Sequence, residues 1–155
     1  MQWVDKDKSS QPDPKAELHG RKIMLCVWWD RCSIIHFKSL SRNETVTADL
    51  YVQQLQHVHQ SLLKKCPALI NRKNVVLLHD NARPHAARVT QEEILELGWS
   101  VLPHPPYSLD LAPSNYHLFR SLQNSLMGTN FTNEHQVREF VEKFFTSKMA
   151  EFYAK

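Results

Sequence analysis

The strongest constraint on the fold of this chain is a short apolar segment that ends in a carboxylate and leads into a helix start. Residues 74 to 80 read Asn-Val-Val-Leu-Leu-His-Asp, a β-branched apolar run typical of a buried strand. Pro84 suits the first turn of a helix, and side chains then recur at helical spacing up to Gly98 (Ala87, Thr90, Ile94 and Leu97). Open α/β sheets carry their chemistry at the carboxyl ends of strands, so the pattern predicts an α/β fold with Asp80 at a strand-to-helix junction.

A second short strand is followed by a proline-rich loop, and a polar side chain, Asn115, lies where this loop leads into the next helix. We expect the strand at residues 99 to 102, and the loop begins at Pro103. Asn115 lies near the end of this loop and is separated from Asp80 by the 34 residues 81 to 114. Asp80 and Asn115 are therefore the candidate pair of functional side chains.

Two strands, near residues 22 to 30 and 33 to 39, are expected to form a hairpin with Asp30 at its turn. Cys32 and Ser33 also stand in the turn, and neither residue type favours a positive φ. A hairpin turn that needs a positive φ would be strained here. We therefore expect this hairpin to be weakened.

Two amphipathic helices are expected, one before Asp80 and one after Asn115 in the sequence. The first runs from about Thr47 to Cys66, ends before Pro67, and should pack on one face of the sheet. The second lies near the carboxyl end, with Asn133 as a plausible N-cap. Both have an apolar stripe at core-facing spacing, formed by Tyr51, Leu55, Val58 and Leu62 in the first helix and by Val137, Phe140, Val141 and Phe144 in the second.

Two stretches of the sequence resemble the signature motifs of the mariner family of DNA transposases. They read His-Asp-Asn-Ala-Arg-Pro-His at residues 79 to 85 and Tyr-Ser-Leu-Asp-Leu-Ala-Pro-Ser-Asn-Tyr-His-Leu-Phe at residues 107 to 119. Residues 22 to 30 resemble the family's second strand, and Phe152 resembles part of its helical tail, so the resemblance covers essentially the whole chain. It implies a ribonuclease-H-like mixed sheet flanked by helices.

The resemblance also implies a sheet that is incomplete at its N-terminal edge. The family's first strand carries the first metal ligand in a motif like Gly-Asp-Glu-Lys-Trp, and nothing in residues 1 to 20 resembles it. We expect residues 1 to 20 to form a polar lead-in and residues 21 to 155 to form a truncated ribonuclease-H-like transposase catalytic domain. The length of 155 residues and the hydrophobic content of 42% agree with one domain.

The chemistry that the resemblance implies is DNA cleavage and strand transfer with two Mg²⁺ or Mn²⁺ ions. Asp80 matches the family's second metal ligand, and Asn115 stands in place of the third, an aspartate. Two metals about 3.5 to 4 Å apart need several anionic oxygen ligands, whereas an asparagine offers one neutral amide oxygen. We therefore expect weakened metal binding and a catalytically inactive chain.

The implied partner is double-stranded DNA at transposon ends, with a homodimer and a nuclear location as further expectations. A formal charge of +3 is too small to prove nucleic-acid binding by itself. Basic residues nevertheless recur around the two motifs. The candidate DNA-binding residues are Arg83, His85, Arg88, His117 and Arg120.

Three classes of function stay open from the sequence. The chain could belong to a DNA-processing enzyme whose full-length form is active, or it could be a domesticated DNA-binding or interaction module. Asn115 and Leu109, which replaces a family proline, favour the second class. The third class is a structural or regulatory partner of a full transposase. The chain could also be the transposase-derived part of a SET-domain histone methyltransferase fused to a mariner element.

Several other functions are disfavoured. The three cysteines form no Cys-x-x-Cys pair, and the histidines near the two motifs (His79, His85, His104 and His117) lack the helical spacing that binds zinc from one face. The longest apolar stretches are far shorter than the roughly 18 to 20 residues that span a bilayer, so no membrane partner is expected. No glycine-rich phosphate-binding loop occurs in a chain with three glycines.

Overall fold

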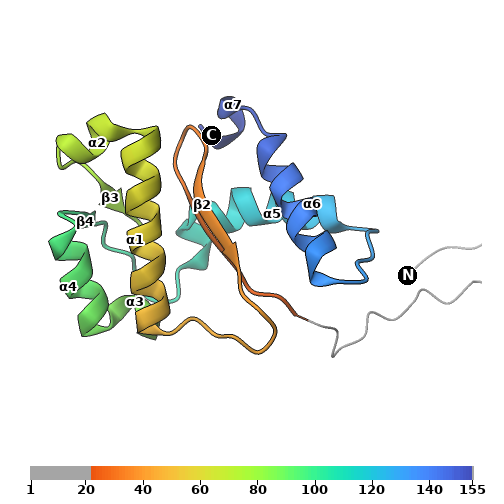
Figure 1. Ribbon diagram of the computed structural model, residues 1–155, viewed down its shortest axis with the longest axis horizontal. Coiled ribbons are helices and arrows are strands. Elements are labelled where there is room, and N and C mark those ends of the chain that lie inside the picture. The colour runs from red at the N-terminus through yellow and green to blue at the C-terminus, as the bar shows by residue number, and fades with distance from the viewer. Residues whose placement is uncertain (1–21, 155) are drawn as a thin grey trace, which may run out of the picture.

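The computed structural model describes residues 22–154, so the expected lead-in at residues 1 to 20 lies outside the described residues. Figure 1 shows the order of the elements along the chain. Two strands open the described part, a long helix crosses it, and two further strands alternate with short helices before a helical tail. The elements are β1 (Leu25–Trp29), β2 (Ile34–Ser39), α1 (Ala48–Lys65), α2 (Pro67–Asn71), β3 (Val76–Leu77), α3 (Arg83–Ala86), α4 (Arg88–Glu96), β4 (Ser100–Val101), the 3-10 turn η1 (Leu109–Leu111), the π-helical turn η2 (Ser114–Phe119), α5 (Arg120–Leu126), α6 (Glu134–Thr146) and α7 (Ala150–Tyr153).

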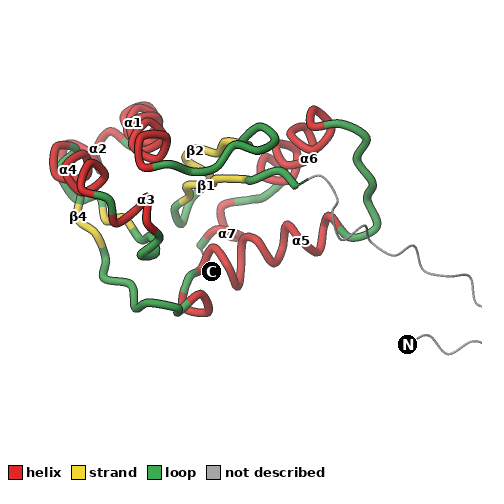
Figure 2. Tube along the Cα trace, turned by 90° about the horizontal axis from the view of Figure 1, so that it is seen from below, coloured by secondary structure: helices red, strands yellow, loops and turns green. Residues whose placement is uncertain are grey.

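The strands form two separate two-stranded sheets within the described residues. β1 pairs with β2 in antiparallel register, and β3 pairs with β4 in parallel register through Val76 opposite Ser100 and Leu77 opposite Val101. Figure 2 shows α1 on one side of the β1–β2 hairpin and α5 on the other. The expected mixture of antiparallel and parallel pairing is therefore present, distributed over two pairs of strands.

The β1–β2 hairpin turns without the strain that the sequence predicts. Neither Cys32 nor Ser33 has a positive φ. The carboxylate of Asp30 instead accepts hydrogen bonds from the backbone N–H groups of Cys32 and Ser33, both at 2.8 Å. The prediction of a strained turn is wrong, because the Asp30 side chain supplies the acceptors that organise the turn.

The long helix α1 matches its prediction closely and organises the first of two cores. The Thr47 hydroxyl caps it by accepting from the Leu50 N–H at 3.2 Å. Its apolar stripe is buried against β2 and β3, with Leu55 fully inaccessible. This first core contains Ile35, Tyr51, Leu55, Val58, Leu62, Val75, Leu77, Ile94 and Trp99.

The second core lies on the other face of the hairpin, against the carboxyl-terminal helices. Asn133 caps α6 through its side-chain oxygen, which accepts from the Gln136 N–H at 2.9 Å, as the sequence predicts. The apolar side chains of β1 and β2 that face away from α1 pack here. This second core contains Leu118, Leu122, Val141, Phe144, Phe145 and Tyr153.

The single helix expected from Pro84 to Gly98 is in fact two helices. The chain breaks at Ala87, which has extended backbone angles (φ −61°, ψ 146°) between α3 and α4. The Thr90 hydroxyl, fully buried, donates to the carbonyl of Pro84 at 2.6 Å and so stabilises the break. Gly98 follows α4 at φ +72°, a conformation that glycine adopts without the steric penalty of a side chain.

None of the helices within residues 22–154 is both long and apolar enough to cross a membrane.

Candidate functional site

Asp80 lies where the sequence predicts it, between the end of β3 and the start of α3. One carboxylate oxygen, Oδ1, accepts from the backbone N–H of Ala82 at 3.0 Å and lies 2.6 Å from Nδ1 of His85. Burial by itself would raise the pKa of Asp80, but these two contacts outweigh it and hold the pKa below its usual value. Asp80 is therefore a carboxylate at neutral pH.

An aromatic and imidazole cluster supports Asp80 from the side of α1. The Tyr51 hydroxyl lies 2.9 Å from Nδ1 of His79, and the His79 ring stacks on the His85 ring with centroids 5.1 Å apart at 8°. The Tyr51 ring also lies 4.2 Å from the His85 ring. Burial is the largest cause that lowers the pKa of His79, to about 4, so this imidazole is neutral at neutral pH.

Asn115 lies on η2, the helical turn that ends the proline-rich loop, and is exposed. Its backbone N–H donates to the carbonyl of Ala112 at 2.9 Å. The preceding residue, Ser114, anchors the turn because its hydroxyl accepts from the indole N–H of Trp29 at 2.8 Å. Asn115 is thus presented at the surface by a turn that is fixed to the end of β1.

The proline-rich loop is also held at its other end, next to Asp80. The side-chain amide of Asn81 donates to the carbonyl of His104 at 2.8 Å. A hollow of about 210 Å³ lies between the two segments, and Asn115 is not among the residues that line it. Its walls are His79, Asp80, Asn81, His85, Ala86, Gln91, Val101, Leu102, Pro103 and His104.

The five candidate DNA-binding residues differ in their surroundings. Arg83, the first residue of α3, and Arg120, the first residue of α5, are exposed. Arg88 pairs with Glu92 at 2.7 Å on the surface of α4. His85 contacts Asp80, whereas the Nε2–H of His117 donates to the carbonyl of Phe152 at 2.6 Å. The structure therefore brings His85 to Asp80 and turns His117 toward the helical tail.

Sequence reasoning missed the supporting residues rather than the candidate pair. Tyr51 was expected only as part of an apolar stripe, and its position on α1 gave no sign that its hydroxyl would reach His79. Trp29 likewise gave no sign of its bond to Ser114, which lies 85 residues later in the chain. Both contacts join segments far apart in the sequence, and no local pattern encodes them.

The donor set fits a two-metal centre poorly. Asp80 supplies one anionic carboxylate, and Asn115 supplies at best a neutral amide oxygen. Within residues 22–154, no group of three or more histidine, cysteine, aspartate or glutamate side chains is placed to hold a metal ion. A two-metal centre held by Asp80 and Asn115 alone would leave the two divalent ions short of negative charge.

The fold and the site define a class, that of ribonuclease-H-like transposases, and the comparisons with known proteins confirm it. A family model described as Transposase (partial DDE domain) matches residues 1–72. Histone-lysine N-methyltransferase SETMAR of Homo sapiens is 43% identical over 153 residues, which are 99% of this chain and 22% of that protein. Mariner Mos1 transposase of Drosophila mauritiana is 40% identical over 152 residues, which are 97% of this chain and 44% of that protein.

Solved structures of Mos1 transposase share the fold. The catalytic domain with raltegravir and Mg has a TM-score of 0.84 at 41% identity, and the match covers 88% of this chain and 69% of that one. A pre-cleavage Mos1 transpososome has a TM-score of 0.94 at 38% identity and covers 99% of this chain and 45% of that one. The chain belongs to the mariner family of transposases, so the expected family and fold class are confirmed. It spans less than half the length of the two relatives named above.

Proposed function

We propose that this chain binds double-stranded DNA at the edge that carries Asp80 and Asn115, and that it does not cut DNA. The observation that carries the second part is the donor set, in which Asp80 is the one carboxylate of the candidate pair. A two-metal mechanism needs anionic ligands that bind both ions and offset their charge. Asp80 and Asn115 supply a single negative charge between them.

Surface charge and the solved relatives support the first part of the proposal. Arg83 and Arg120 are exposed at the starts of the two helices that follow Asp80 and Asn115, where they are available to phosphate groups. Solved Mos1 structures include a paired-end complex with the left transposon end and a strand transfer complex. We extend the proposal to DNA binding at transposon ends. A homodimer and a nuclear location are further parts of this proposal.

A plasmid nicking assay tests the inactivity. Supercoiled plasmid is incubated with the chain and either Mg²⁺ or Mn²⁺, and we expect no metal-dependent conversion to open circles. Asn115→Asp restores one carboxylate but still leaves two metal ions with too few anionic ligands, so we expect little gain from it. Robust metal-dependent cleavage by the unmodified chain would overturn the proposal of inactivity.

A gel-shift titration at several salt concentrations tests the DNA binding. Phosphate contacts release counterions, so the affinity should fall steeply as salt rises. Replacing Arg83 and Arg120 by alanine together should weaken binding and reduce the salt slope by roughly two contacts. Arg138→Ala, on the exposed surface of α6, is the matched control and should change neither. Absent or salt-insensitive binding would instead favour a protein-interaction module.

A further inference from the structure

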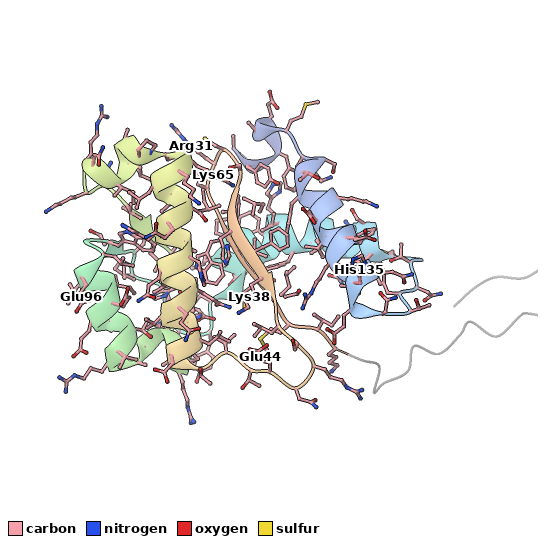
Figure 3. The ribbon with its side chains drawn as sticks, viewed as in Figure 1. Arg31, Lys38, Glu44, Lys65, Glu96 and His135 are labelled. Carbon is pink, nitrogen blue, oxygen red and sulfur yellow. The ribbon has the colours of Figure 1, made fainter. Side chains whose placement is uncertain are left out.

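A second surface, away from Asp80, lies along the outer edge of β2. A cleft of about 460 Å³ runs beside this strand and is bounded by the end of α1 and by α6 and α7. Figure 1 shows β2 between α1 and α6, and Figure 3 shows Lys65 and Lys38 on the α1 side of the strand. The lining residues include Ile35, Phe37, Lys65, Glu142, Phe145 and Lys148.

The register of the hairpin shows which backbone groups face the cleft side. The Leu40 N–H donates to the carbonyl of Met24 at 2.8 Å, and pairs alternate between hydrogen-bonded and non-hydrogen-bonded along an antiparallel ladder. Phe37, opposite Val27, falls on a non-hydrogen-bonded position and directs its N–H and C=O away from β1. The outer edge of β2 therefore presents backbone groups that another strand could pair with.

Lys65 shows that a backbone carbonyl on the outer edge of β2 is accessible to a hydrogen-bond donor. Its Nζ donates to the carbonyl of Ile34 at 2.6 Å, close to the hairpin turn. Lys65 is the last residue of α1, so its long side chain reaches the strand edge from a neighbouring helix. It occupies one carbonyl at one end of the strand and leaves the Phe37 position to other partners.

The chemistry of the cleft indicates what kind of strand it fits. Its floor is apolar, with Phe37 against Phe145 at a centroid distance of 5.4 Å. Two lysines, Lys65 and Lys148, and one carboxylate, Glu142, line it, so the lining carries an excess of positive charge. The Lys148 ammonium is held over the Phe144 ring at 4.6 Å. An extended segment with alternating apolar and acidic side chains would match both the floor and the charge.

We propose that this cleft binds an extended acidic peptide of another protein, which adds to β2 as a further strand. Two other occupants fit the cleft less well. A second copy paired edge to edge through β2 would bring the Lys65 and Lys148 residues of both copies toward one another, which like-charge repulsion opposes. Nucleic acid would meet Glu142, and its phosphate oxygens could accept from the outward-facing N–H of Phe37 but could not donate to the carbonyl of Phe37, as a peptide N–H can. The proposal is independent of DNA binding at Asp80.

Fluorescence anisotropy tests the proposal with a short, end-blocked peptide that alternates valine with glutamate. We expect saturable binding that weakens with salt, and binding that is lost when the glutamates are replaced by lysines. Lys148→Glu should weaken the affinity by about fivefold, because an attraction becomes a repulsion at a surface site. Lys143→Glu, an equal charge change on an exposed residue of α6 that does not line the cleft, should weaken it by less than about twofold.

Backbone pairing needs its own measurement, since electrostatic attraction alone would also respond to salt. The amide of Phe37 should exchange more slowly with solvent when the peptide is bound, and a peptide methylated on alternate backbone nitrogens should fail to protect it. Equal protection by the methylated peptide, or equal binding of the lysine peptide, would overturn the proposal. So would a concentration-dependent dimer that protects Phe37 without peptide, or protection of Phe37 by duplex DNA.

Discussion

At the scale of single residues, Tyr51 connects α1 to the surroundings of Asp80. Its hydroxyl lies 2.9 Å from His79, its ring lies against His85, and its side chain is 4% exposed. Tyr51→Phe keeps the ring and leaves the half-buried His79 Nδ1 without its partner, so the free energy of unfolding should fall by ~1 kcal/mol in urea denaturation. Tyr107→Phe removes a fully exposed hydroxyl and should change nothing. Equal losses in both variants would contradict this role of Tyr51.

Two histidines should make stability depend on pH. Burial is the largest cause that lowers the pKa of His79, to about 4, and that of His36, whose ordinary value is also 6.5. Unfolded chains bind these protons near pH 6.5, so the unfolded state holds more protons below that pH and stability falls as the pH drops toward 4. The pKa of the Asp80 carboxyl is held below its ordinary value of 3.8, so the stability it contributes is present throughout this window and is lost only in more acidic solution.

A His79→Gln variant separates the two histidines. Thermal unfolding measured from neutral pH to about pH 4 should show a flatter decline in Tm for the variant than for the original chain, because only the His36 contribution remains in this window. His135→Gln, a surface histidine of α6, should keep the original slope. An unchanged slope in His79→Gln would contradict the lowered pKa of the half-buried His79 imidazole.

At the scale of elements, the break between α3 and α4 depends on Thr90. This side chain is fully buried, and its hydroxyl supplies the 2.6 Å bond to the Pro84 carbonyl. Thr90→Val keeps the shape but leaves that carbonyl unsatisfied, so we expect a loss of ~1 to 2 kcal/mol in the free energy of unfolding. Thr146→Val, which removes an exposed hydroxyl from the surface of α6, should cost far less in the same urea titration. If Thr90→Val and Thr146→Val lowered the free energy of unfolding equally, the hydrogen bond from Thr90 would not stabilise the break between α3 and α4.

The elements also show what the sequence could and could not predict. Periodicity and capping residues located α1 and α6 because both signals are local, as with Thr47 and Asn133. The helix break at Ala87 could not be predicted, because one helical stripe of side chains continues through both short helices. The break is stabilised by the hydrogen bond from Thr90 to the Pro84 carbonyl, which the periodicity does not show. The hairpin turn was misjudged because its stabilising group is the side chain of Asp30 rather than the backbone of the turn itself.

At the scale of the whole molecule, the sequence was enough to name the candidate pair, whose functional role stays a prediction, but it was not enough to predict the surroundings of the pair. Asp80 and Asn115 followed from motifs at fixed spacing, and the strand-to-helix junction followed from a local apolar run. The contacts that define their environment, such as Tyr51 with His79 and Trp29 with Ser114, join segments 28 and 85 residues apart. The division of the strands into two pairs is also a long-range property. The sequence pattern of a single strand is the same whether the four strands form one sheet or two.

The β1–β2 hairpin should make the two cores unfold together, because its two faces belong to different cores. Trp28 and Ile35 pack into the first core, whereas Val27 and Phe37 pack against the second. Leu55→Ala in the first core and Leu118→Ala in the second each remove a fully buried side chain, at an expected cost of ~2 to 5 kcal/mol. If the hairpin couples the two cores, each substitution should lower the denaturation midpoint of the first core and that of the second core by the same amount.

Fluorine NMR of a chain labelled with 5-fluorotryptophan can follow the two cores separately. Trp99 reports on the first core and Trp29 on the second. A shared midpoint in the original chain that moves as one in both variants is the expected result. The opposite result would be separate midpoints, in which Leu55→Ala lowers only the midpoint reported by Trp99 and Leu118→Ala lowers only the midpoint reported by Trp29. It would mean that the hairpin is packed too weakly to make the two cores unfold together. In that case the Asp80 edge, which is built on the first core, would be stable independently of the helical tail.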